Sequence, residues 1–214
     1  MFLNQFTNPE YWLNLLYSLP AVLIALSFHE YAHAWAANWC GDATARSRGR
    51  MSLDPLKHLD PVGTICLLLF HFGWAKPVPV NPRNYRHPRR DDVIVSLAGI
   101  IMNFIVAFVA YGIYYITVYV AGWDNMIFVR IMTPIILLNI TLGIFNLIPI
   151  PPLDGFHVLS AIAPRPMHKF GAAVGRYGMI ILLVLLATGA ISWLLNGVTS
   201  GVLMLYDGFW RLVA

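Results

Sequence analysis

An apolar run from about Tyr11 to Trp39 constrains this chain most, because it is long enough to cross a lipid bilayer as one tilted helix. The run contains the motif His29-Glu30-Tyr31-Ala32-His33, and Glu30 is its only charged residue. An ionisable residue at membrane depth is costly and is by default a functional candidate. The run therefore predicts a membrane helix that carries chemistry.

The motif has the form H-E-x-x-H. On a helix, positions i and i+4 share one face, so His29 and His33 can bind one Zn²⁺ together. Glu30 is then placed to take a proton from a water that the metal activates. In a soluble chain this pattern indicates a metalloprotease, and here it indicates one that works within the membrane.

The composition agrees with a membrane protein. Hydrophobic residues make up 58% of the 214, charged residues 11%, and the mean hydropathy is +0.66. These values predict an all-α polytopic membrane protein with about five to six membrane segments, and one membrane-embedded domain over 1–214. The net charge of +4 comes from basic residues in short loops, which is typical of membrane orientation. We therefore expect a lipid bilayer around the chain, and no nucleic acid as a partner.

Several apolar segments follow the first one. Val62 to Trp74 is too short for an ordinary span and is interpreted as a short or re-entrant helix. Longer segments are expected at Val93–Val120, Met126–Ile148 and Tyr177–Leu195, with a marginal final segment at Gly197–Ala214. The prolines between 149 and 155 predict extended backbone there. The catalytic core would cover about 11–160, and additional C-terminal helices about 177–214.

The basic loops predict the orientation of the chain. Twelve of the 14 Lys and Arg residues lie at 41–61, at 75–92 and in the loop after Asp154. Placing these loops in the cytoplasm satisfies the positive-inside rule, provided that 62–74 does not cross. The N-terminus then lies outside, and the motif is approached from the cytoplasmic side. Met1–Glu10 has no Lys or Arg, so we expect the first segment to remain as an anchor.

A catalytic zinc usually has three protein ligands, so the motif needs one more. Asp154 is a candidate, because it follows an apolar span on a turn forced by prolines, where a metal would satisfy its charge. The alternative is a turn aspartate that bonds to its own backbone. His157 is a competing ligand.

The motif and a later stretch together resemble a known family. Residues 146–155, which read Asn-Leu-Ile-Pro-Ile-Pro-Pro-Leu-Asp-Gly, follow the motif by more than a hundred residues. The motif followed by this stretch, in this order, resembles the site-2 protease family of intramembrane zinc metalloproteases. Residues 72–85, Phe-Gly-Trp-Ala-Lys-Pro-Val-Pro-Val-Asn-Pro-Arg-Asn-Tyr, look like its compact prokaryotic branch.

The resemblance implies a site and a setting. It implies one Zn²⁺ held by His29, His33 and Asp154, with Glu30 as the general base and Asn146 as a donor to the substrate carbonyl. It also implies a multi-pass protein of a prokaryotic cell membrane that cleaves peptide bonds within or near the transmembrane helices of membrane proteins, in regulated intramembrane proteolysis. The oligomeric state is left open.

Two departures from the family pattern stand out. Where the family often has Gly-Pro-x-x-Asn, this chain reads Gly99-Ile100-Ile101-Met102-Asn103, and we expect Asn103 to keep a packing or substrate contact without the proline. The family commonly continues Asp-Gly-Gly, but here Phe156 follows Gly155. This departure bears on the backbone after Asp154 rather than on the ligand itself.

Residues 75–85 form a further candidate for substrate binding. Val78 and Val80 alternate with prolines, which predicts a small extended, β-like element whose edge would pair with an unwound peptide. An ordinary proline-rich connector has the same pattern. Two other functions compete with proteolysis: a noncatalytic zinc-binding protein that binds transmembrane clients, and a zinc transporter, which needs polar ligands on several spans.

Overall fold

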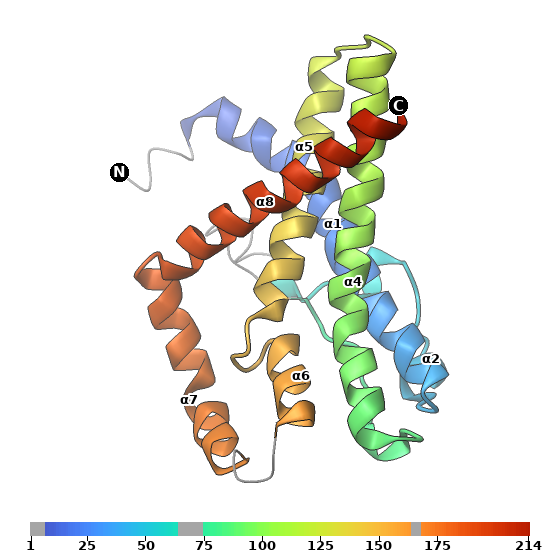
Figure 1. The fold of residues 1–214 in the computed structure, drawn as a ribbon, viewed down its shortest axis with the longest axis vertical. Helices are drawn as coiled ribbons and strands as arrows, with labels where there is room; N and C mark the ends of the chain where they lie inside the picture. Colours follow the sequence, from blue (N-terminus) through green and yellow to red (C-terminus); the bar gives the residue numbers. More distant parts are fainter. Residues whose placement is uncertain (1–6, 64–74, 164–167) are drawn as a thin grey trace.

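The structure is a computed structural model that describes residues 7–63, 75–163 and 168–214 (Figure 1). Every regular element in these ranges is a helix. The elements are α1 (Pro9–Trp39), α2 (Thr44–Ser47), the 3₁₀ turns η2 (Pro55–Lys57) and η3 (Pro82–Asn84), α4 (Pro88–Tyr115), its π-helical continuation η4 (Ile116–Val120), α5 (Met126–Leu147), α6 (Asp154–Ile162), α7 (His168–Ala187) and α8 (Ala190–Val213).

Three of these helices are long and apolar enough to cross a membrane: α1, α4 together with η4, and α5. A fourth span is obtained if the bent pair α7 and α8 is counted as one. The prediction of an all-α fold is therefore confirmed for the described residues, and three to four candidate membrane-spanning helices agree with a polytopic membrane protein. The count of five to six segments stays a prediction. So does the re-entrant helix, because residues 64–74 lie outside the described ranges.

Local sequence signals explain where the spans begin and end. The Asn8 side chain accepts a hydrogen bond from the Glu10 N–H at the start of α1, and Pro9 occupies the first turn. The Asn125 side chain caps α5 in the same way. α5 ends just before the prolines, as predicted. α6 was not expected, since it begins at Asp154, inside the stretch predicted to be extended.

α1, α4 and α5 pack together through small residues. Ala21 of α1 meets Ala107 and Ala110 of α4 against a row of isoleucines on α5. Small side chains let membrane helices approach closely where no hydrophobic force drives them together. Large apolar side chains such as Ile105 and Ile113 are half exposed on the outside of the bundle, as lipid-facing residues would be.

α7 and α8 differ from the prediction. One unbroken span over Tyr177–Leu195 is wrong, because α7 ends at Ala187 and α8 begins at Ala190 with a 74° bend between the two axes. Gly189 allows the bend, since its φ of +75° lies in the left-handed region that favours glycine. The predicted segment Gly197–Ala214 is therefore not separate but the greater part of α8.

α8 crosses over α4 and α5 near the end of the bundle that carries the α4–α5 turn (Figure 1). Trp210 packs against Phe108 and lies over Gly112, where a Cβ atom would be only 2.2 Å from the indole ring. The Tyr111 hydroxyl donates to Asp207 at 3.1 Å. These contacts fasten the last helix to α4.

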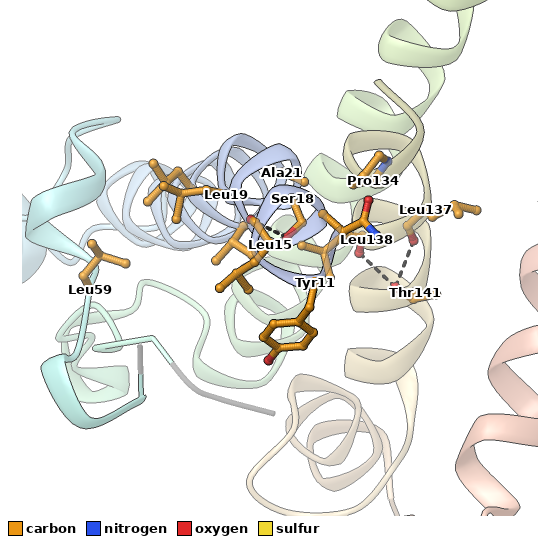
Figure 2. A pocket seen from close by; sticks show the side chains of 13 residues that line it. Tyr11, Leu15, Ser18, Leu19, Ala21, Leu59, Pro134, Leu137, Leu138 and Thr141 are labelled. Atoms are coloured by element: carbon orange, nitrogen blue, oxygen red, sulfur yellow. Dashed lines mark hydrogen bonds between the residues drawn. The ribbon is translucent and has the colours of Figure 1, made fainter. Parts of the chain in front are cut away.

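A cavity of about 570 Å³ lies between the N-terminal half of α1 and α5 (Figure 2). Its walls are mostly leucine and other apolar side chains, with Ser18 and Thr141 among the few polar ones. Both hydroxyls donate to carbonyls of their own helices. The cavity contains none of the residues that the motifs single out.

The segment from Ala75 to Tyr85 is not helical until η3. Ala75 forms an isolated antiparallel bridge with Leu59, and no β-strand occurs in the described residues. The predicted β-like element is thus limited to this bridge, and pairing with a peptide stays a prediction. The bridge and a hydrogen bond of 2.8 Å from the Lys76 N–H to the His58 carbonyl oxygen place the start of the segment beside Leu59. Val78 then contacts Glu30 of α1.

Candidate metal centre

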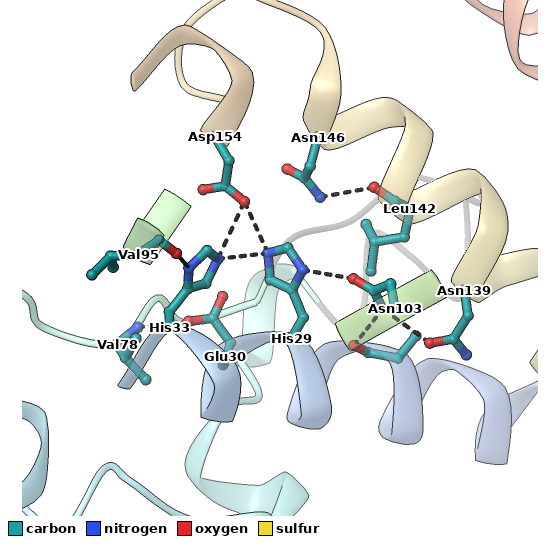
Figure 3. Close-up of polar contacts among 11 residues, drawn as sticks. His29, Glu30, His33, Val78, Val95, Asn103, Asn139, Leu142, Asn146 and Asp154 are labelled. Carbon is teal, nitrogen blue, oxygen red and sulfur yellow. Dashed lines mark hydrogen bonds and ion pairs between the residues drawn. The ribbon is translucent and has the colours of Figure 1, made fainter. Parts of the chain in front are cut away.

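The two histidines of the motif and Asp154 meet inside the bundle (Figure 3). His29 and His33 lie one turn apart on α1 and are 6% and 8% exposed. Their Nε2 atoms are 3.0 Å from each other, and each is 3.2 Å from the Asp154 Oδ2 atom. Two segments more than 120 residues apart therefore contribute three ligand atoms to one point.

The hydrogen-bond partner of each Nδ1 atom determines whether the Nε2 atom of the same imidazole presents a lone pair to this point. His33 Nδ1 is 2.7 Å from the Val95 carbonyl oxygen, which can only accept, so Nδ1 carries the hydrogen. His29 Nδ1 is 2.6 Å from Asn103 Oδ1 and donates to it. In the neutral imidazoles both Nε2 atoms then present lone pairs, which is the tautomer that binds a metal.

This arrangement fits zinc. Tetrahedral zinc with bonds of about 2.0–2.1 Å holds its ligand atoms roughly 3.3 Å apart, close to the three distances found here. Three acceptor atoms also converge, and none of them carries a hydrogen that the others could accept. A bound cation would satisfy all three acceptors. The set of two imidazoles and one carboxylate is typical of a catalytic zinc with an open position.

Asp154 reaches the site because α6 folds back on the end of α5. Gly155 makes this possible, since a Cβ atom there would be 2.3 Å from the Leu147 carbonyl oxygen. The Asp154 carboxylate contacts the two imidazoles rather than a backbone turn. His157, the competing ligand, lies exposed on α6 outside this group.

α4 approaches the two histidines closely at Gly99. A Cβ atom at this position would be 2.4 Å from His33 Nε2 and 2.7 Å from His29 Cε1. Real Cβ atoms do not come so near, so only glycine leaves room for the imidazoles. The sequence drew attention to Gly99 through the family pattern, but its contact with the metal centre was not foreseen.

Glu30 contacts the segment that was predicted to bind substrate. The Glu30 carboxylate is 8% exposed, and its Oε2 atom accepts a hydrogen bond of 2.8 Å from the Val78 N–H. Val78 is buried, whereas Val80 is 39% exposed. The structure thus ties Val78 to the proposed general base and leaves Val80 at the surface of the segment.

Two further residues hold this segment in place. The Arg50 guanidinium donates to the carbonyl oxygens of Lys76 and Pro77 at 2.7 and 3.2 Å. The Asp42 carboxylate, fully buried, accepts from the Asn81 N–H at 2.7 Å. Neither residue was singled out from the sequence, because each looks like an ordinary loop charge.

The hydrogen bonds also affect the ionisation of Asp42. Burial raises the pKa of this carboxyl, but hydrogen bonds from Thr44, Asn84 and Asn81 lower it more, so the pKa lies below its ordinary value. Asp42 therefore stays ionised well below neutral pH and keeps its hold on the segment.

The two predicted asparagines lie on different sides of the centre (Figure 3). Asn146, half-buried at the end of α5, is drawn beside Asp154, and its amide donates to the Leu142 carbonyl of its own helix at 3.0 Å. Asn103 is fully buried behind His29 and contacts Asn139 of α5. Asn139 was missed, although a lone amide inside an apolar span is a visible signal.

Comparison with known proteins agrees with this geometry. The sequence model of peptidase family M50 matches residues 17–127 and 116–186. The chain is 36% identical over 208 residues to "Putative zinc metalloprotease YwhC" of Bacillus subtilis, covering 91% of this chain and 93% of that relative. It is 29% identical over 177 residues to "Putative zinc metalloprotease Rip2" of Mycolicibacterium smegmatis, covering 79% of this chain and 66% of the relative. No solved structure matches the chain.

The family match covers most of the chain, including the motif and Asp154, and the relatives share the zinc metalloprotease description. Zinc is accordingly the cofactor, and in the described part of the chain His29, His33 and Asp154 form a group that could hold it. The chain belongs to peptidase family M50, the site-2 protease family that its motifs resemble.

Proposed function

We propose that this protein is an intramembrane zinc endopeptidase that hydrolyses peptide bonds within or near transmembrane helices of membrane-protein substrates. The observation that carries the proposal is the convergence of His29, His33 and Asp154 on one point, with Glu30 on the same helix. This group lies within a chain whose longest helices are apolar enough to cross a bilayer. A peptidase site on such helices favours a membrane-embedded substrate.

The side chains divide the work of hydrolysis. Zinc held by the three ligands supplies a Lewis acid, which polarises the scissile carbonyl and makes water more acidic. The Glu30 carboxylate takes the proton of the attacking water and later delivers it to the leaving amine. The Asn146 amide, turned away from Leu142, donates a hydrogen bond to the carbonyl oxygen as negative charge develops on it.

The substrate segment would be bound in an unwound form. A helix hides its carbonyl groups in backbone hydrogen bonds, so the peptide must be extended before water can attack it. Val80 has the first backbone N–H after Val78, because Pro79 has none. It has no acceptor among the described residues, so it is free to pair with an extended peptide.

We also propose the setting. The protein would lie in a prokaryotic cell membrane with its N-terminus outside and would act in regulated intramembrane proteolysis, on single-span proteins. The basic loops at 41–61 and 75–92 support the orientation, because positive loops stay in the cytoplasm.

The first test is zinc content per chain in detergent for the wild type, Glu30→Gln and Asp154→Ala. We expect one zinc in the wild type and in Glu30→Gln, because Glu30 is not a ligand. Asp154→Ala should lose zinc or bind it much more weakly. An unchanged zinc content in Asp154→Ala would show that Asp154 is not a ligand.

The second part of the test asks whether the centre cleaves proteins. Membranes from cells that produce the wild type or Glu30→Gln are compared by mass spectrometry for new protein termini. We expect termini within or near predicted spans that depend on Glu30. If the same termini occurred in both samples although both proteins bind zinc, the cleavage would not depend on Glu30. The protein would then be a noncatalytic zinc-binding protein, and the proposal would be overturned.

A further inference from the structure

Two buried amides connect three helices behind the metal centre (Figure 3). Asn103 of α4 and Asn139 of α5 are both 0% exposed. The Asn103 Nδ2 atom donates to the Ala25 carbonyl oxygen of α1 at 3.1 Å and to Asn139 Oδ1 at 2.9 Å. A buried amide in an apolar bundle is costly unless its hydrogen bonds are made, and here they are.

Backbone carbonyls fix the orientation of both amides. The Asn139 Nδ2 atom donates to the Ile135 carbonyl oxygen at 2.8 Å, and that oxygen can only accept. Asn139 therefore turns Oδ1 toward Asn103, whose Nδ2 must face it. The Ala25 carbonyl requires the same orientation of Asn103. No rotation of either amide by 180° preserves these bonds.

The fixed orientation determines the state of His29. Because Asn103 Nδ2 is turned to Ala25 and Asn139, its Oδ1 atom is turned to His29 Nδ1, 2.6 Å away. An oxygen acceptor at this distance requires hydrogen on Nδ1. The Nε2 atom of the neutral imidazole is then unprotonated on the side of His33 and Asp154.

We propose that Asn139 and Asn103 form a positioning relay, which holds His29 in the Nδ1–H tautomer and fixes its ring toward the metal. The proposal rests on the metal centre of the proposed function. The relay starts at the Ile135 carbonyl, passes through two amides, and ends at a metal ligand. Neither asparagine touches the reacting atoms, so both are positioning residues.

The relay also links the metal centre to the placement of α5. Asn139 and Asn146 are seven residues apart, which is about two helical turns, so they lie on one side of α5. The bond between Asn139 and Asn103 therefore contributes, with the packing of the three helices, to the height of Asn146 relative to His29.

The test reads the tautomer directly in metal-free protein in detergent. Selective ¹⁵N labelling of histidine distinguishes Nδ1–H from Nε2–H imidazoles by NMR, and His29→Gln assigns the His29 signals. We expect His29 to be in the Nδ1–H form in the wild type. Asn139→Leu and Asn103→Leu should shift it toward a mixture of the two tautomers.

Two variants separate the relay from general packing. In Asn139→Asp, a side chain kept neutral by burial can still accept from Asn103 and donate to Ile135, so the wild-type tautomer should be retained. Thr141→Val removes a hydroxyl that bonds only within α5, and it should change nothing. An Nδ1–H signal that persists in folded Asn139→Leu would overturn the relay.

Zinc affinity gives the second readout, measured by competition with a chelator. Loss of partners behind a metal-bound histidine typically weakens binding by about 10- to 100-fold, and we expect this for Asn103→Leu and Asn139→Leu. Asn139→Asp and Thr141→Val should bind as the wild type does. If the wild type itself bound no zinc, the proposed function would fail, while the NMR result would still decide the relay.

Discussion

At the scale of single residues, the metal centre depends on a missing side chain as much as on its ligands. Gly99 has no chemistry, yet it lets α4 lie against the rings of His29 and His33. The same helix supplies Val95 and Asn103, which hold the second nitrogen of each imidazole. The close approach at Gly99 therefore brings the orienting acceptors within reach.

Gly99→Ala should weaken zinc binding by about 10- to 100-fold. The new methyl group would overlap the imidazole of His33, and overpacking of this kind costs about 1–3 kcal/mol as α4 moves away. Chelator competition on the purified protein measures the effect. The control is Gly201→Ala on α8, where nothing lies within 4 Å of the added methyl group.

The control should keep wild-type affinity and gain slightly in thermal stability, because alanine favours a helix over glycine by up to about 1 kcal/mol. Equal zinc affinity in Gly99→Ala and the wild type would show that the two helices can separate without disturbing the ligands. The close approach would then have no role in the centre.

The site residues that the sequence predicted most directly belong to one motif with a fixed spacing. His29, Glu30 and His33 follow a pattern with a direct chemical meaning, and the helix that carries them needs no tertiary information. Asn139 has no such pattern, because its partners lie on other helices. Its role depends on which residues of α1 and α4 face it, and this is determined only when the helices pack.

At the scale of elements, the segment 76–81 is held mainly from one side. Glu30, Arg50 and Asp42 come from α1 and from the residues that follow it, and each bonds to the segment's backbone. Val80 remains half exposed and its N–H has no acceptor in the described part of the chain. An extended peptide that paired with Val80 would lie close to Glu30, the proposed general base, because Val78 already contacts Glu30.

Proline substitutions should separate the two roles of this segment. Val80→Pro removes the N–H proposed to pair with substrate and should raise KM with little change in kcat. Val78→Pro removes the N–H that orients Glu30 and should lower kcat. Both variants should retain zinc. Cleavage is measured on a reconstituted single-span substrate. This substrate is one of the proteins in which mass spectrometry of the membranes finds new termini that depend on Glu30.

Val78→Ala and Val80→Ala are the matched controls, since they shorten the side chains but keep the backbone donors. They should cleave much faster than the proline variants. If Val80→Pro cleaved with wild-type kinetics, the segment would be a connector rather than a binding edge, as its proline-rich sequence equally permits.

Hydropathy predicted α1 and α5 well but failed at the C-terminal helices. The start of α1 and the end of α5 are marked by Pro9 and by the prolines after Leu147. Between α7 and α8 the sequence stays apolar, and Gly189 alone permits the bend. Glycine is common inside membrane helices, so its left-handed conformation is not visible from composition.

At the scale of the whole molecule, the two ends of the bundle differ in charge. Figure 1 shows α2 and the start of α4 at one end, and the α4–α5 turn with the C-terminus at the other. The first end carries the basic loops, whereas the turn after Val120 has Asp124 and no basic residue. A charge difference of this kind orients membrane proteins with the basic end in the cytoplasm.

The orientation is testable with single cysteines in a background without Cys40 and Cys66. Ala121→Cys and Ser47→Cys both place an exposed thiol outside the candidate spans without changing a charge, one in the α4–α5 turn and one at the end of α2. A maleimide that cannot cross membranes should label Ala121→Cys in intact spheroplasts. It should label Ser47→Cys only after the membrane is opened, because α2 faces the cytoplasm in the proposed orientation. The reverse pattern would place the metal centre nearer the outer surface, and substrates would then have to enter from outside.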